Sequence, residues 1–347
     1  MQLAKRTKPL DFKDPFPTIT RALIFVLVCL QISCATNIKD SDSVNAFVKK
    51  MALSHQFYEV ELNKVFEAVE YKEDVIDKIS RPAEAMPWYK YRKIFMTDAR
   101  INGGVKFWQE NEAVLAAVGK KTGVPAEIIV AIIGVETLYG QKTGNYRVID
   151  TLSTLSFAYP PRSHFFLGEL ESYLLLCRDE HLNPLVPIGS YAGAMGAPQF
   201  MPSSYTHYAV DYDGDGYRDI WHNNGDIIAS VANYFVKHQW QSGQAVAIPV
   251  SATGVTYKNA LTKGLKPDLR VDQLDLLNLI ISRPLPFNTK VKLLAFEQEA
   301  LGQRSGEELW VGLDNFYVIT RYNHSPLYAM AVYQLSQAIL NKKGTFP

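Results

Sequence analysis

The chain has 347 residues, of which 47% are hydrophobic and 20% are charged. This is the composition of a globular protein with enough apolar material for roughly two domains. Because 36 basic residues nearly balance 35 acidic ones, the net charge of +1 gives no indication of a nucleic-acid partner.

The first 34 residues have the pattern of an export signal. Basic residues precede the apolar stretch 22–30, which is too short for a comfortable membrane span. Cys34 follows at the position of a bacterial lipoprotein processing site, although Gln31 stands where an aliphatic residue is usual. We predict a signal peptide over 1–34, lipidation of Cys34 and a polar tether over 35–45. A plain signal peptide cut nearby, or an uncleaved anchor, stays open as an alternative.

The rest of the chain is predicted to be mainly helical with a small β-rich part. We expect a largely helical part over 46–120, a core over 121–245, a β-rich part over 246–320 and a C-terminal helix within 321–347. The predicted strands are 290–296, 308–312 and 316–320. Ser325 and Pro326 predict the start of the last helix, which runs to about Leu340. Cys177 has no partner outside the signal region and is expected to be a core residue.

Glu136 is a carboxylate in unusual surroundings. The preceding run 125–135 is almost entirely apolar and predicts a buried helix with Glu136 at its end and Gly140 as its stop. Apolar surroundings and the carboxyl end of a helix both disfavour a negative charge, so both raise the pKa of this carboxyl. A carboxyl that keeps its proton near neutral pH is suited to general acid catalysis. The alternative is an ordinary glutamate that reaches solvent just beyond a core helix.

The segment 189–205 mixes small, amide, hydroxyl and aromatic side chains. Small residues let a backbone approach a ligand closely, and Ser190, Gln199 and Ser203 offer hydrogen-bonding groups. This mixture is typical of a groove wall for a sugar chain. A tightly packed corner between two helices would have a similar composition.

The acidic segment 211–219 has the pattern of a calcium loop of the EF-hand type. Alternate carboxylates converge on one cation, and Gly216 permits the sharp turn. The twelfth loop position, however, is His222 where glutamate is usual, and Asp226 is the nearest carboxylate that could replace it. Asp226 also precedes an apolar run, where it could instead be a helix N-cap. The carboxylates at loop positions one, three and five are Asp211, Asp213 and Asp215.

Together these segments resemble the lytic murein transglycosylase B family, from about residue 45 to the C-terminus. The resemblance implies a lysozyme-like core, an α-helical domain and a small β domain, a mainly α (α+β) fold. It also implies cleavage of the β-1,4 bond between N-acetylmuramic acid and N-acetylglucosamine in peptidoglycan, with a 1,6-anhydro product. The segments that carry it are Gly134-Val-Glu-Thr-Leu-Tyr-Gly140, Thr151-Leu-Ser-Thr-Leu-Ser-Phe157, Gly193-Ala-Met-Gly196, Gln199-Phe-Met-Pro-Ser-Ser204, the acidic segment, Ser230-Val-Ala-Asn-Tyr-Phe235 and Thr320-Arg-Tyr-Asn-His324.

The resemblance also assigns residues. Glu136 matches the family's single catalytic acid/base. The positions that match its sugar groove are Tyr91, Arg162, Ser190, Gln199, Tyr234, Tyr322, Asn323 and Tyr328. The positions that match its structural calcium loop are Asp211, Asp213, Asp215, Tyr217 through its carbonyl, and Asp226. One extra residue between Trp221 and Asp226 makes the role of Asp226 the least secure, and no organic cofactor is expected.

The type of reaction depends on whether a second carboxylate lies near Glu136. Most glycosidases place two carboxylates around the bond they cleave, and the segment around Glu136 offers no obvious second one. Glu169, Glu171 and Asp179 stay open as distant candidates. A single carboxyl is enough if the muramyl C6 hydroxyl replaces water. The alternatives are a muramidase, or a noncatalytic lipoprotein that binds peptidoglycan.

These assignments imply a location and partners. We expect a periplasmic protein that binds glycan strands and is held at the outer membrane by its lipid, or is soluble without it. We expect a monomer, and membership of a cell-wall enzyme complex is left open.

Overall fold

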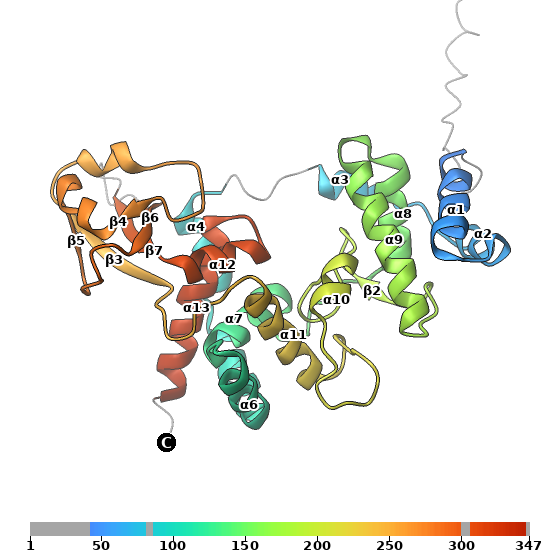
Figure 1. Cartoon of the computed structure of the whole chain (residues 1–347), viewed down its shortest axis with the longest axis horizontal. Coiled ribbons are helices and arrows are strands. Elements are labelled where there is room, and N and C mark those ends of the chain that lie inside the picture. The colour runs from blue at the N-terminus through green and yellow to red at the C-terminus, as the bar shows by residue number, and fades with distance from the viewer. Residues whose placement is uncertain (1–41, 81–85, 300–305, 345–347) are drawn as a thin grey trace, which may run out of the picture. The chain divides into compact units, whose positions relative to one another are not determined.

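The computed structural model describes residues 42–80, 86–299 and 306–344, which form part of one compact unit (Figure 1). The predicted signal peptide, Cys34 and most of the predicted tether lie outside these residues. Helix α1 begins at Asp42, so the last residues assigned to the tether are helical. Each described helix is too short or too polar to cross a bilayer.

The N-terminal helices pack through a cluster of aromatic rings. The ring of Phe47 lies 5.9 Å from that of Phe66 and 6.0 Å from that of Phe157, in edge-to-face geometry that favours aromatic pairs. This cluster joins α1, α2 and α8, although α8 follows much later in the chain. The first six helices are α1 (Asp42–His55), α2 (Glu59–Glu67), α3 (Glu73–Ile79), α4 (Trp88–Phe95), α5 (Asp98–Glu110) and α6 (Glu112–Thr122).

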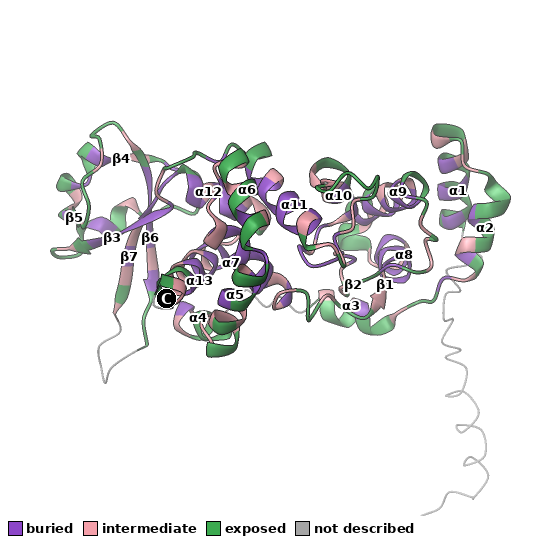
Figure 2. Cartoon of the chain, turned by 90° about the horizontal axis from the view of Figure 1, so that it is seen from below, coloured by how far each residue is buried: buried purple, intermediate pink, exposed green. Residues whose placement is uncertain are grey.

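The centre of the helical part is α7, which is apolar on every side. Its residues 128–135 are all buried, against α5, α11 and α13. Figure 2 shows this burial along α7, α11 and α13. Burying each isoleucine side chain contributes about 1.5–3 kcal/mol, so this helix is fixed firmly in place. The remaining helices are α7 (Ala126–Thr137), α8 (Val148–Ala158), α9 (Ser163–Asp179), α10 (Pro202–Tyr208), α11 (Asn224–Lys237), α12 (Asp314–Tyr322) and α13 (Pro326–Gly344).

A five-stranded antiparallel sheet has its own hydrophobic cluster. The strand order is β4-β6-β7-β3-β5, and β6 pairs with β7 so that Leu293 lies opposite Val311. The predictions of strands at 290–296 and 308–312 are confirmed. The strands are β3 (Ala247–Ala252), β4 (Leu269–Arg270), β5 (Leu279–Ile281), β6 (Lys290–Glu297) and β7 (Glu307–Gly312), with short 3-10 helices at Thr256–Ala260, Val271–Gln273 and Asp275–Leu277.

The predicted strand at 316–320 is wrong, because this segment belongs to helix α12. Phe316, Ile319 and Thr320 are buried at helical spacing, and α12 packs on α13. A short apolar run is compatible with both a strand and a buried helix. Here the packing of the segment on α13 favours the helix. The last helix does begin at Pro326, and the hydroxyl of Ser325 accepts the backbone N–H of Tyr328.

Two other sequence predictions concern short segments. Cys177 is buried in α9, as expected for a core residue. The segment 189–205 is a corner in which β2 (Ile188–Gly189) pairs with β1 (Tyr146–Arg147), and Met195 pairs with both Gly189 and Phe200. This hydrogen-bonded corner leads into α10 and places its loop beside the end of α7.

Candidate active site and acidic loop

Glu136 is the second-last residue of α7, and the end of that helix is sharply defined. Leu138 has a left-handed backbone with φ of 51°, and its N–H bonds to the carbonyl of Gly134. The bond from Leu138 to Gly134 is that of an αL cap, and the N–H of Tyr139 reaches one residue further back, to the carbonyl of Ile133. The helix therefore stops before Gly140, the predicted stop, and it stops without a glycine at the cap.

Thr137 fastens this helix end to the corner segment. Its hydroxyl donates to the carbonyl oxygen of Ala197 at 2.8 Å and accepts the backbone N–H of Gly140 at 3.0 Å. Both partners are needed because the Thr137 side chain is fully enclosed, where an unsatisfied hydroxyl would be costly. Glu136 is thereby held at a fixed position relative to the loop 193–200.

Tyr139 supports the same helix end from the other side. Its hydroxyl donates to the carbonyl oxygen of Arg100 at 2.7 Å, and the Arg100 Nε donates to the carbonyl of Gly134 at 3.0 Å. A Cβ atom at Gly134 would lie 2.5 Å from the Tyr139 hydroxyl, so the glycine makes room for this ring.

Glu136 is half-buried, and among the described residues its carboxyl has one hydrogen-bond partner. The hydroxyl of Tyr328, on α13, donates to Oε1 at 2.5 Å. Loss of hydration raises the pKa of Glu136 from its usual 4.5 to about 7, and the Tyr328 hydrogen bond acts in the opposite direction. Glu136 thus exchanges its proton near neutral pH, which suits a group that must act as acid and as base.

Tyrosines form the wall beside Glu136. The rings of Tyr328 and Tyr322 are nearly parallel, with centroids 6.5 Å apart, and the Tyr322 hydroxyl donates to the carbonyl of Pro198 at 2.7 Å. The Tyr234 ring lies 4.6 Å from that of Tyr322, and its hydroxyl donates to the carbonyl of Arg321. Burial first and the nearby Glu136 second raise the pKa of both Tyr322 and Tyr328, so they stay protonated donors.

Ser190 and Gln199 shape the corner loop. The Ser190 hydroxyl accepts the backbone N–H of Ala194 at 3.1 Å, and the Gln199 side chain donates to the carbonyls of Thr143 and Gly196. Gly196 has φ of 65°, and a Cβ there would lie 2.4 Å from the carbonyl oxygen of Ile220. The small residues of this segment therefore serve close backbone packing.

The remaining predicted groove residues have different surroundings. Tyr91 stacks on Trp88 and contributes to the raised pKa of Tyr328, which places it near the acid site. Asn323 is exposed at the end of α12. Arg162 is exposed in the 3-10 helix Pro160–Arg162, where its guanidinium lies 4.5 Å from the ring centre of Phe165. Among the described residues, Arg162 and Asn323 make no hydrogen bond or ion pair with Glu136.

The three distant carboxylates have partners of their own. Glu169 is buried and accepts both the backbone N–H and the hydroxyl of Ser203. Glu171 pairs with Lys50 and His55, and Asp179 is exposed beside Arg178. Burial and the Tyr328 hydroxyl are the influences on the pKa of Glu136, and neither is a second carboxylate.

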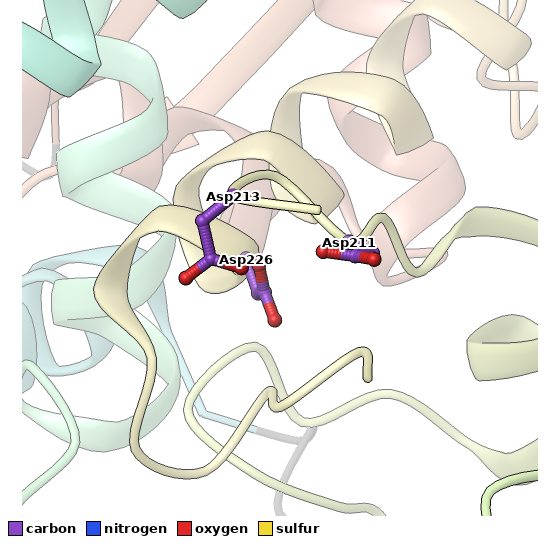
Figure 3. Close-up of side chains that lie close together, drawn as sticks. All are labelled: Asp211, Asp213 and Asp226. Carbon is purple, nitrogen blue, oxygen red and sulfur yellow. The ribbon is translucent and has the colours of Figure 1, made fainter. Parts of the chain in front are cut away.

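The acidic loop brings Asp211, Asp213 and Asp226 together (Figure 3). Carboxylate oxygens of the three lie within 4.8 Å of one another. Asp211 accepts the N–H groups of Gly216 and Gly214, and these bonds hold its pKa below the usual value. Gly216 has φ of 93°, as the sharp turn requires.

The residues of this loop fit a hard cation. Like charges gathered so closely repel one another, and a divalent cation with oxygen ligands would relieve that repulsion. Asp215 is exposed and accepts the N–H of Tyr217, so its carboxylate is outside the group of three.

Asp226 has a different local role from the N-cap considered above. Asn223 is the N-cap of α11, and its side chain accepts the N–H groups of Gly225 and Asp226. Asp226 is fully buried and accepts the N–H groups of Tyr212 and Asp219, each at 2.8 Å. It therefore ties both halves of the loop to α11. Asn223 also donates to Asp213, which is a contact that the loop pattern did not predict.

Three residues that the sequence did not predict support the site from behind. Thr137, Arg100 and Tyr139 hold the end of α7 through backbone carbonyls, and such bonds leave no pattern in a sequence. The only available signal was the position of Thr137 directly after Glu136.

Comparison with known proteins agrees with this geometry. Residues 39–337 match the family model described as the transglycosylase SLT domain. The membrane-bound lytic murein transglycosylase B of Escherichia coli K12 is 41% identical over 310 residues, which is 86% of this chain and 83% of that protein. The chain belongs to the transglycosylase SLT domain family. It is a peptidoglycan lytic transglycosylase, so the noncatalytic alternative is wrong.

Solved structures of the family share the fold. Soluble lytic transglycosylase SltB1 from Pseudomonas aeruginosa is 47% identical with a TM-score of 0.82, covering 87% of this chain and 100% of that one. Escherichia coli Slt35 in complex with calcium is 41% identical with a TM-score of 0.80, covering 88% and 95%. SltB3 from Pseudomonas aeruginosa in complex with NAG-anhNAM-pentapeptide is 30% identical with a TM-score of 0.74, covering 86% and 78%. The predicted lysozyme-like, mainly α fold with a small β part is confirmed.

Proposed function

We propose that this enzyme cleaves the β-1,4 bond between N-acetylmuramic acid and N-acetylglucosamine and releases a 1,6-anhydromuramyl product. The observation that carries the proposal is Glu136, a single carboxyl with a pKa of about 7 whose hydrogen-bond partner is a tyrosine hydroxyl. The SltB3 complex with an anhydromuramyl ligand supports this product class.

In the first step, protonated Glu136 gives its proton to the glycosidic oxygen. The bond between that oxygen and muramyl C1 breaks, and its electron pair stays on the departing sugar oxygen. The muramyl N-acetyl group stabilises the electron-poor C1. The hydroxyl of Tyr328 occupies Oε1, which leaves Oε2 to face the substrate.

In the second step, ionised Glu136 removes the proton of the muramyl C6 hydroxyl. The C6 oxygen then forms a bond to C1 and closes the anhydro ring. Glu136 regains the proton that it gave away, so no water is consumed and no second carboxylate is needed. A pKa near neutrality serves both steps, because neither proton transfer is then strongly uphill.

The glycan groove follows the wall of tyrosines and the corner loop. Tyr328, Tyr322, Tyr91, Gln199 and Ser190 line it closest to Glu136. Tyr234 is buried behind Tyr322 and positions that ring. Asn323 and Arg162 offer exposed donors for more distant parts of a glycan strand or its peptide.

The acidic loop holds a structural calcium ion. Asp211, Asp213 and Asp226 supply the carboxylates that already lie together, with Asp215 and the carbonyl of Tyr217 completing the set. Asp226 takes the place of the glutamate that is absent at His222. The calcium complex of Slt35 supports this proposal. A bound ion would brace the connection between α10 and α11, which carries the groove wall.

The protein works in the periplasm as a monomer, anchored to the outer membrane through lipidated Cys34. The membrane-bound relative supports anchoring. Replacing Cys34 with serine should move the protein from the membrane fraction to the soluble fraction. An unchanged membrane fraction would exclude the lipid anchor.

The test of the reaction is the mass of its products. Purified peptidoglycan is digested with the enzyme, and the muropeptides are weighed. Anhydro products are expected from the wild type and none from a Glu136→Gln variant. Products heavier by one water would identify a muramidase instead.

A further inference from the structure

A cavity lies at the start of α7, at the opposite end of this helix from Glu136. Its volume is about 420 Å³, within the usual range for a small-ligand site. The lining comes from the start of α7, the turn after α11, strand β3 and the later part of α13. The side chains that matter are Glu127, Trp240, Gln244, Arg283, Tyr333 and Gln337.

The cavity holds an anion and a cation that do not pair with each other. Glu127 is half-buried, and burial raises its pKa, opposed by its own backbone N–H. Arg283 is exposed and opposes the raised pKa of Tyr333, which places its guanidinium near that hydroxyl. Among the described residues, no ion pair involves Glu127 or Arg283. Opposite charges are thus available at separate positions of one cavity.

The turn after α11, which forms one wall of this cavity, is fixed in place. Asn315 is fully buried, and its amide donates to the carbonyls of Gln241 and Gln244, at 2.8 and 2.9 Å. The Trp240 indole N–H donates to the carbonyl of Gly123 at 3.1 Å. Ligand sites are usually preformed in this way, because ordering a loop on binding would reduce affinity.

We propose that this cavity is a second ligand site, which binds a short peptide through its free amino and carboxylate groups. Glu127 receives the ammonium group, Arg283 receives the carboxylate, and Trp240 and Tyr333 face the aliphatic part between them. The helix dipole accounts for an acidic residue in the first turn of α7. It does not account for an unpaired arginine on the same cavity.

The stem peptide of peptidoglycan carries both groups once it is freed from the glycan. Choosing it as the probe rests on the proposed function, whereas the charge argument does not. Binding of free peptide involves no glycosidic bond, so its result is independent of whether the anhydro product forms.

The test is calorimetric titration of the full-length protein with the free stem pentapeptide and two capped forms. One form has its amino groups acetylated, and the other has its carboxylates amidated. Each cap should weaken binding by about tenfold, since each removes a charge-assisted hydrogen bond. Glu127→Gln should lose sensitivity to acetylation but keep sensitivity to amidation, and Arg283→Gln should show the reverse. This crossed pattern cannot come from a misfolded variant.

Matched controls are available on the same protein. Glu73 lies in the first turn of α3, as Glu127 does in α7, and Lys266 is an exposed charge. Glu73→Gln and Lys266→Gln should bind like the wild type. Absent binding, equal affinity for capped peptides, or binding that survives both cavity substitutions would overturn the proposal. So would displacement by excess chitooligosaccharide, because that would place the peptide in the glycan groove.

Discussion

Glu136 and the acidic loop are two carboxylate sites that differ in number and in surroundings. Glu136 is single, poorly hydrated and bonded to a tyrosine hydroxyl, so its pKa rises to about 7. The loop gathers three carboxylates around one point, and backbone N–H groups keep Asp211 ionised. The same functional group is thus prepared to move a proton at one site and to hold a cation at the other. The neighbours of each carboxylate, more than its residue type, set its role.

The largest effect is expected from removing the proton-carrying group. Glu136→Gln should lower turnover of peptidoglycan by about 10³-fold or more, since an amide neither donates this proton nor takes it back. Rates of muropeptide release measure it. Glu73→Gln is the control, because Glu73 is an exposed glutamate outside both proposed sites, and it should keep wild-type activity on glycan strands. Substantial turnover by Glu136→Gln would show that another residue is the catalytic acid.

The next largest effect concerns the cation. Calcium at about a hundred times its dissociation constant should stabilise the fold by about 2–3 kcal/mol, so chelation should lower the melting temperature. Asp211→Asn should remove most of this response, whereas Asp179→Asn, at an exposed aspartate outside the loop, should leave it intact. A melting temperature that changes neither on chelation nor on readdition of calcium would contradict a structural calcium ion.

The stability of the Glu136→Gln variant tests the acid site without any substrate. The folded-state pKa exceeds the unfolded one, so the folded protein holds the extra proton between about pH 4.5 and 7. This contribution is fully present below the unfolded pKa and is lost as the pH rises through 7. At pH 8 the variant should therefore be more stable than the wild type by up to about 3 kcal/mol, since each pKa unit between 4.5 and about 7 corresponds to about 1.4 kcal/mol, with little difference near pH 4. If the variant and the wild type had equal melting temperatures at pH 8 as well as at pH 4, Glu136 would be well hydrated.

The smallest effect is a change in pH dependence. The Tyr328 hydroxyl favours ionised Glu136, so Tyr328→Phe should raise its pKa by less than about one unit. The alkaline limit of activity should move upward by the same amount. Tyr333 is on the same helix as Tyr328, and its hydroxyl donates to the carbonyl of Ala247. Tyr333→Phe should leave the alkaline limit of activity unchanged. A downward shift in Tyr328→Phe would contradict the arrangement at Oε1.

The two groups of carboxylates could be predicted from the sequence, whereas the residues that hold them in place could not. The apolar run before Glu136 and the alternating aspartates are local patterns, so both could be recognised. Thr137 and Arg100 act through backbone carbonyls elsewhere in the fold, and no local pattern encodes such partners. The helix at Phe316 was mistaken for a strand because its short apolar run fits both periods. Packing on α13 decided between them.

The most direct measurement is the titration of Glu136 itself. Carbon-13 labelling of glutamate side chains, with Glu136→Gln to assign the signal, follows the carboxyl by NMR between pH 4 and 9. A midpoint near 7 is predicted, because loss of hydration outweighs the Tyr328 hydrogen bond. A midpoint at the usual value of about 4.5 would show an ionised carboxylate at neutral pH and would contradict its role as the acid.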